Sequence, residues 1–217
     1  MFVRSMTYIV IFVLGTLLEY IVDAWSSRLV LEKKQFCFVL RHWPVRMLTG
    51  GMSVMVVAKN GVTVLSLSIV LYSVILIIIG IVDWNTFVIP NQLNYSLVMI
   101  AILFLLQQSD ISIEERVVGF FIISISMLVI TLVYFGAFGG GDIKMIAVSG
   151  FILGSEQILI AWSISVLCCG MYVCYLLLMK KGTRKSKIQL GPFLSIGCYM
   201  GILYGHSIVK WLFHTSL

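Results

Sequence analysis

Three consecutive glycines, Gly139 to Gly141, lead into Asp142 at the start of an apolar run. An acid in the middle of a bilayer costs roughly 2.5–3.5 kcal/mol on insertion scales, and acids kept in such segments usually face a cavity or a site. An Asp at this position can also cap a helix, because it accepts hydrogen bonds from free N–H groups at the positive end of the helix dipole. Capping explains Asp142 but not the three glycines before it.

A second acid, Asp83, ends a strongly apolar run at residues 62–82. Two carboxylates that share one site cannot both ionise cheaply, so the pair holds a single proton. The ionised member can take a proton from water as the water attacks a carbonyl. The protonated member can polarise that carbonyl and later protonate the leaving amine. If Asp83 and Asp142 share a site, they can do the chemistry of an aspartic protease, which needs no metal or cofactor.

Paired acids in a membrane also occur in proton and cation pathways. Such proteins more often place their acids near the midplane of the bilayer, with broken helices and internal repeats. No repeat relates the two halves of this sequence. A small membrane transporter or proton channel with paired acids is the alternative from another functional class.

The composition is that of a membrane protein. Of the 217 residues, 60% are hydrophobic and 11% are charged, and the mean hydropathy is +1.08. The net charge of +6 is therefore interpreted as a signal of membrane topology, and no nucleic-acid partner is expected. The five cysteines form no CxxC pair, so no metal site is predicted.

Apolar runs close to the length of a membrane span predict an all-α, polytopic bundle of about eight transmembrane helices. The expected spans are 2–22, 45–59, 62–82, 92–107, 116–135, 143–154, 157–179 and 190–209. Asn60-Gly61 is a tight-turn signal between two of them. Gly197, Gly201 and Gly205 recur every four residues and predict a packing face within the protein, with a homo-oligomer contact as the alternative.

Basic residues are concentrated in two of the loops between these spans, 23–44 and 180–189. They hold nine of the fifteen basic residues: Arg28, Lys33, Lys34, Arg41, Lys180, Lys181, Arg184, Lys185 and Lys187. Because basic loops stay in the cytoplasm, the amino terminus is expected outside. Asp83 then ends an inward-running helix and Asp142 begins an outward-running one, so both acids are predicted at the cytoplasmic edge of the membrane.

The order of several motifs resembles the type IV prepilin peptidases, membrane aspartic proteases of the GxGD kind. Asp83 is followed by Ile89-Pro90-Asn91, and Gly139-Gly140-Gly141-Asp142-Ile143-Lys144 comes later. His42 to Gly50 resembles the segment before the family's second span, and Leu190-Gly191-Pro192-Phe193 resembles its late Gly-Pro-Phe motif. Gly15 to Leu18 is a weaker match to its Gly-Ser-Phe-Leu. Together these motifs cover nearly the whole chain.

The resemblance implies cleavage of a short basic leader from prepilins or pseudopilins, at the cytoplasmic face of a bacterial inner membrane. It makes Asp83 and Asp142 the catalytic pair and divides the chain into 1–61, with two spans and a short loop, and 62–217, the peptidase domain. Lys144 is expected either to tune the charge of the pair or to anchor its helix at the membrane surface. Substrate-binding or supporting roles are predicted for Gly139, Gly140, Gly141, Lys144, Pro90 and Asn91.

The first cytoplasmic loop departs from larger members of that family. Those members carry two CxxC pairs there, whereas this loop holds only Cys37 and is shorter, and Arg46 stands where they usually have an acid. Methylation of the new amino terminus is associated with that loop region in the family. The sequence therefore predicts a short peptidase without methylating activity; an inactive structural partner in pilus assembly is a further alternative.

Overall fold

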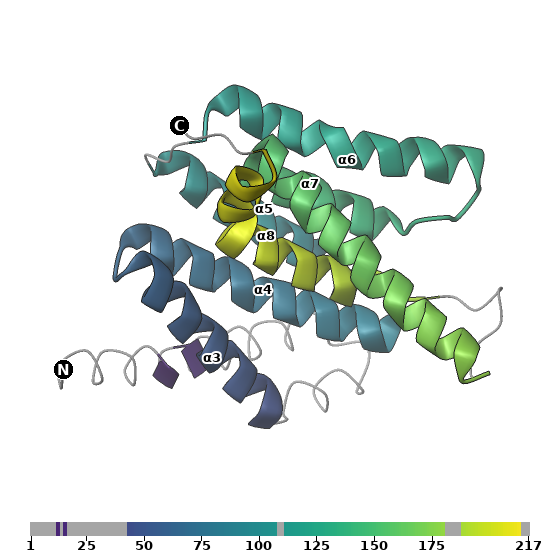
Figure 1. Cartoon of the computed structure of the whole chain (residues 1–217), viewed down its shortest axis with the longest axis horizontal. Coiled ribbons are helices and arrows are strands. Elements are labelled where there is room, and N and C mark those ends of the chain that lie inside the picture. Colours follow the sequence, from purple (N-terminus) through teal and green to yellow (C-terminus); the bar gives the residue numbers. More distant parts are fainter. Residues whose placement is uncertain (1–11, 14, 17–42, 108–110, 181–187, 214–217) are drawn as a thin grey trace.

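The computed structural model describes residues 12, 13, 15, 16, 43–107, 111–180 and 188–213. Within these residues the chain is all-helical and contains no strand (Figure 1). The helices are α3 (Trp43–Asn60), α4 (Val64–Thr86), α5 (Asn91–Leu106), α6 (Ile113–Val133), α7 (Gly140–Leu178) and α8 (Gly191–Phe213). The prediction of an all-α fold is confirmed.

The prediction of about eight spans is not supported. By length and composition, four helices of the described residues can cross a membrane: α4, α6, α7 and α8. Helix α5 has 16 residues, and α3 is too polar over its 18 residues to qualify. The expected first span, 2–22, lies almost wholly outside the described residues. Four apolar spans indicate a multi-pass membrane protein.

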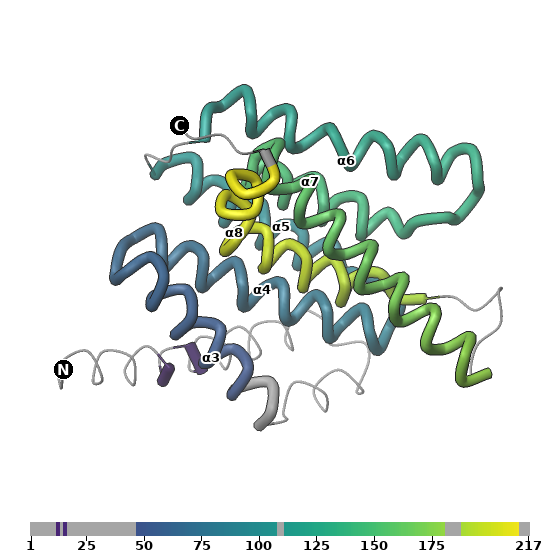
Figure 2. The backbone as a smooth tube through the Cα atoms, in the orientation of Figure 1, coloured from purple at the N-terminus to yellow at the C-terminus, as the bar shows by residue number. Residues whose placement is uncertain are grey.

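Helix α7 is broken at Gly154, where φ is 80° and ψ is 174°. This break falls at the predicted boundary between the runs 143–154 and 157–179. The ring of Tyr172 lies 5.7 Å from that of Trp84, next to Asp83, so the second half of α7 ends near where its first half begins. A straight helix would separate residues 142 and 172 by about 45 Å. The chain therefore turns back at Gly154, as Figure 2 shows.

Local signals in the sequence explain where several helices begin and end. Gly61, with φ at 73°, makes the predicted turn between α3 and α4. The Thr63 side chain accepts a hydrogen bond from the Ser66 amide and caps α4. Ser112 and Glu115 form a reciprocal capping box at the start of α6. These caps fix the amino-terminal ends of α4 and α6.

Small residues allow the helices to approach closely. The predicted glycine face of α8 packs within the protein, because Cβ atoms at Gly197, Gly201 and Gly205 would all meet α7. Gly119 of α6 and Gly150 of α7 leave no room for each other's side chains. In a membrane the hydrophobic effect does not drive helices together, because lipid tails are as apolar as the side chains. Close packing of backbones at small residues supplies the attraction between helices instead.

Replacing Gly154 by Ala should destabilise the fold, whereas Gly170→Ala should not. An alanine at 154 would strain a backbone conformation that only glycine adopts readily, and its Cβ would lie 2.9 Å from Ile111 Cγ2. We expect a loss of about 1–3 kcal/mol. Gly170 is helical with open space around it, so alanine there should stabilise by about 0.5–1 kcal/mol. Thermal unfolding midpoints in one detergent, at one scan rate, compare the two; equal midpoints would contradict the strained turn.

Candidate active site

Asp83 lies in the last turn of α4 and is 4% exposed. Its Oδ2 accepts a hydrogen bond of 2.9 Å from the backbone N–H of Gly191, the first residue of α8. A Cβ at position 191 would lie 2.7 Å from that same oxygen, so only glycine allows the contact. The backbone of one helix thus orients the carboxylate of another.

Asp142 is the third residue of α7, after the N-cap residue Gly139. Its carboxylate interacts with the backbone N–H of Gly139, as the acid of a capping box does. The expectation that Asp142 caps a helix is therefore met in this form. One carboxylate oxygen, Oδ1, is buried and has no hydrogen-bond partner among the described residues. Capping leaves that oxygen for another role.

The structure brings Asp83 and Asp142 together. The two carboxylates are close enough to interact electrostatically, although 59 positions separate them in sequence. Figure 1 shows the carboxyl end of α4 and the amino ends of α7 and α8 at one end of the bundle. Two carboxyl groups in one largely buried site can share a proton and act jointly on a water molecule and a carbonyl.

The segment between α4 and α5 packs against the glycine loop. Ile89 is 6% exposed, and a Cβ at Gly141 would lie 2.8 Å from the Ile89 Cβ. The side chain of Asn94 donates to the Gly141 carbonyl at 3.5 Å. Gly141 therefore makes room for the chain's own Ile89. Of the three glycines, only Gly140 has open space where a side chain would be.

Lys144 and Asn91 connect α7 to α5. The Lys144 ammonium donates to Asn91 Oδ1 at 2.9 Å. Asn91 is the first residue of α5, after the N-cap residue Pro90, which makes no side-chain cap. Neither role predicted for Lys144, in charge tuning or as a surface anchor, includes this bond. This hydrogen bond joins the start of α7 to the start of α5, next to the segments that carry the other predicted supporting residues.

Sequence reasoning missed Gly191 as a residue of the site. Its only signal was the Leu190-Gly191-Pro192-Phe193 motif, which no local pattern connects with Asp83. Phe193 of the same motif belongs to an aromatic cluster, because the Tyr172 ring lies 5.4 Å from the Phe193 ring and 5.7 Å from the Trp84 ring.

Among the described residues no three metal-binding side chains cluster, and the loop with Cys37 lies outside them.

Comparisons with known proteins agree on one family. Residues 70–174, which include both acids, match the model of the type IV leader peptidase family. A prepilin leader peptidase/N-methyltransferase of Bacillus subtilis (strain 168) is 30% identical over 149 residues, which is 68% of this chain and 60% of the relative. Proteins of the same name from Aeromonas salmonicida (strain A449) and Aeromonas hydrophila are 26% identical over 185 and 179 residues. Those matches cover 82% and 79% of this chain, and 62% and 61% of the relatives.

The chain thus spans about 60% of the length of the curated relatives it matches. No solved structure matches it.

Replacing Gly141 by Ala should loosen the site, whereas Gly140→Ala should not. The new Cβ at 141 would press on Ile89, and a side chain forced into a filled space costs about 1–3 kcal/mol. The amides of residues 87–89 should then exchange with deuterium faster than in the parent protein. The neighbouring Gly140→Ala adds the same methyl group in open space. If both variants exchange alike, Ile89 does not hold the glycine loop.

Proposed function

Because residues 70–174 belong to the type IV leader peptidase family, we propose that this chain is a membrane aspartic endopeptidase that cleaves the leader from type IV prepilins or pseudopilins. The observation that carries the proposal is the placement of Asp83 and Asp142 at one end of the helical bundle, close enough for their carboxylates to interact electrostatically. Family membership supports the substrate class, and the pair supplies the chemistry.

In the proposed reaction one carboxylate of the pair is ionised and the other protonated. The ionised group takes a proton from water, and the resulting oxygen nucleophile attacks the carbonyl carbon of the scissile peptide bond. The protonated group donates a hydrogen bond to the carbonyl oxygen. As the C–N bond breaks, a proton passes to the leaving amine, and a carboxylic acid and an amine are released. A pair of carboxyl groups is sufficient for each proton transfer.

The surroundings of the pair favour this use. The Gly191 N–H fixes the orientation of the Asp83 carboxylate without occupying its second oxygen. Asp142 Oδ1 is buried and has no partner among the described residues, so no hydrogen bond within them opposes its use in proton transfer. Gly140 lies beside Asp142 without a side chain or a close neighbour, and the backbone of an extended substrate can approach there.

We place the site at the cytoplasmic face of the bacterial inner membrane. The carboxyl end of α7, Leu178, and the amino end of α8, Gly191, flank the basic loop with Lys180, Lys181, Arg184, Lys185 and Lys187, and Gly191 lies in the site. Loops rich in Lys and Arg stay in the cytoplasm. The active site and the basic loop then share one side of the membrane.

Asp83→Asn and Asp142→Asn should each reduce cleavage of a prepilin by at least about a hundredfold, because each removes one proton-transfer group. The assay uses the full chain reconstituted in lipid vesicles, with prepilin cleavage followed by gel mobility. Glu114→Gln, an exposed acid in the first turn of α6, is the matched control and should leave the rate unchanged. Cleavage that survives either substitution in the pair would exclude the two-aspartate mechanism, and a transporter would show no cleavage at all.

The mature pilin released by this chain should carry an unmethylated amino terminus. The relatives are named leader peptidase and N-methyltransferase, but the loop region with which methylation is associated in the family is shorter in this chain and has no CxxC pair. Mass spectrometry of the product made with S-adenosylmethionine present measures this directly. A product heavier by one methyl group would show that the chain also methylates.

A further inference from the structure

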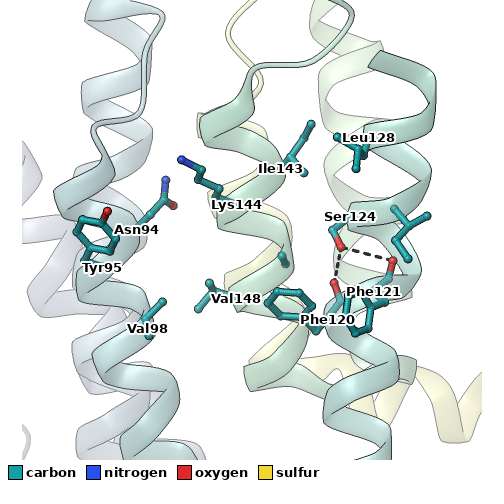
Figure 3. Close-up of a pocket in the computed structure, with 12 residues that line it drawn as sticks. Asn94, Tyr95, Val98, Phe120, Phe121, Ser124, Leu128, Ile143, Lys144 and Val148 are labelled. Atoms are coloured by element: carbon teal, nitrogen blue, oxygen red, sulfur yellow. Dashed lines mark hydrogen bonds between the residues drawn. The ribbon is translucent and has the colours of Figure 1, made fainter. Parts of the chain in front are cut away.

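Two hollows in the described part of the chain differ in chemistry. One, of about 430 Å³, lies between α5, α6 and α7 and is lined mainly by aliphatic and aromatic side chains (Figure 3). Its Ser124 hydroxyl donates to carbonyl groups of its own helix, as the dashed lines show, so it offers a ligand little besides contact with carbon. The other, of about 460 Å³, has charged side chains in its lining, which the proposed function does not explain.

This second hollow, which we call the distal pocket, lies at the end of the bundle opposite the aspartate pair. It is bordered by Lys59 near the end of α3, Leu65 in the first turn of α4 and His206 in the second half of α8. Leu65 and Asp83 are 18 residues apart on one helix, which is about 27 Å along its axis. Because several helices begin or end beside it, the pocket lies at the depth where lipid headgroups meet the protein.

Charged groups are scarce in this chain, yet several of them converge on the distal pocket. Its lining includes two acids, two cations and a histidine: Glu115, Glu156, Lys59, Arg116 and His206. Of the five acids among the described residues, two form the candidate active site and two others line this pocket. Ionisable groups kept within a membrane protein mark functional sites by default. The distal pocket is therefore a candidate for a second site.

Backbone carbonyl groups hold the two cations of the pocket in place. The Lys59 ammonium donates to the Leu203 carbonyl of α8. Arg116 is 2% exposed, and its guanidinium donates to the Phe151 carbonyl of α7 at 3.1 Å. An ammonium has three N–H donors, so a single bond to a carbonyl orients Lys59 without using them all. Side chains that are already oriented lose less freedom when a ligand binds.

The two acids of the pocket come from separate helices. One oxygen of Glu115, Oε2, accepts the Ser112 N–H at 3.2 Å within the capping box of α6, and this bond uses only one of the two carboxylate oxygens. Glu156 is exposed and follows the break of α7 at Gly154. The pocket thus presents fixed charges of both signs within one hollow.

We propose that the distal pocket binds the headgroup of a zwitterionic phospholipid, with the phosphate at the basic side chains and a primary amine at the carboxylates. An anion alone would be repelled by the two acids, and a cation alone by Lys59 and Arg116, whereas a ligand with both charges meets a partner for each. A primary ammonium has N–H groups to donate to a carboxylate in charge-assisted hydrogen bonds, and the trimethylammonium of choline has none. The expected ligand is therefore of the phosphoethanolamine kind.

The rest of the lining suits the part of a lipid where the headgroup joins the acyl chains. The deep wall of the pocket is apolar, with Ile69, Phe104 and Leu153 each 4% exposed or less. The glycerol group and the first acyl carbons can pack there while the charged groups stay at the rim. A cavity of about 460 Å³ also falls within the usual size of small-molecule sites.

Lipid selectivity tests the proposal. The full chain in one detergent is mixed with equal amounts of phosphatidylethanolamine, phosphatidylcholine and phosphatidylglycerol that carry the same acyl chains, and native mass spectrometry measures how much of each stays bound. We expect phosphatidylethanolamine to exceed each of the others by about tenfold, because phosphatidylglycerol lacks the amine and phosphatidylcholine lacks its N–H groups. Equal retention of the three lipids overturns the proposal.

Variants locate the bound lipid. Glu156→Gln and Lys59→Met should each reduce the preference for phosphatidylethanolamine to about twofold or less, since each removes one charged partner. Glu114→Gln and Lys210→Met, at exposed positions of α6 and α8 outside the pocket, are the matched controls and should keep it. Asp142→Asn should keep it as well, so the result does not depend on peptidase activity. If the two pocket variants retain the full preference, the lipid binds elsewhere and the proposal is wrong.

Free phosphoethanolamine distinguishes a lipid from its soluble headgroup. It should displace bound phosphatidylethanolamine only in at least about hundredfold excess, because it lacks the glycerol and acyl carbons that pack on the apolar wall. Displacement at equal concentrations would assign the distal pocket to a soluble ligand and contradict the lipid assignment.

Discussion

The hydrogen bond from the Gly191 amide to Asp83 constrains the whole end of the bundle. It requires the first turn of α8 to lie against the last turn of α4, at a distance that a side chain at position 191 would prevent. Because both helices are long, fixing one pair of ends also sets where they cross. The glycine face of α8 then packs on α7 and brings the amino end of α7, with Asp142, to the same place. The Gly191 amide thus links α8 to α4, and the glycine face links α8 to α7.

The turn at Gly154 is the second requirement. It lets both halves of α7 contribute at one end, the first half with Asp142 and the second with Tyr172. The aromatic contacts of Tyr172 with Trp84 and Phe193 join the same three helices from another side. The close backbone contact between Gly119 and Gly150 holds the first half of α7 to α6. The packing of helices at glycines therefore determines where Asp83 and Asp142 lie. The two aspartate side chains make few contacts that could position them.

The sequence predicted what depends on local pattern and charge. Apolar runs predicted the all-helical fold that the structure shows. The distribution of basic residues predicted that Asp83 and Asp142 lie at the cytoplasmic edge of the membrane, and this stays a prediction. It did not predict what depends on contacts between distant segments. Nothing near Gly191 indicates that its amide bonds to an acid 108 positions earlier. Three adjacent glycines look alike in sequence, yet Ile89 takes the space beside Gly141 and leaves Gly140 open. The predicted number of spans is not supported, because among the described residues short apolar runs such as 45–59 do not form helices that are long and apolar enough to cross a membrane.

The central claim is that Asp83 and Asp142 act as one unit on the scissile bond. A double-mutant cycle tests this claim. It measures the affinity of the parent protein and its variants for a leader peptide in which a hydroxyethylene group replaces the scissile amide. If both carboxyl groups bind that hydroxyl, Asp83→Asn or Asp142→Asn alone removes most of the affinity, and the second substitution adds little. Losses that are independent and add in the double variant would contradict a shared site.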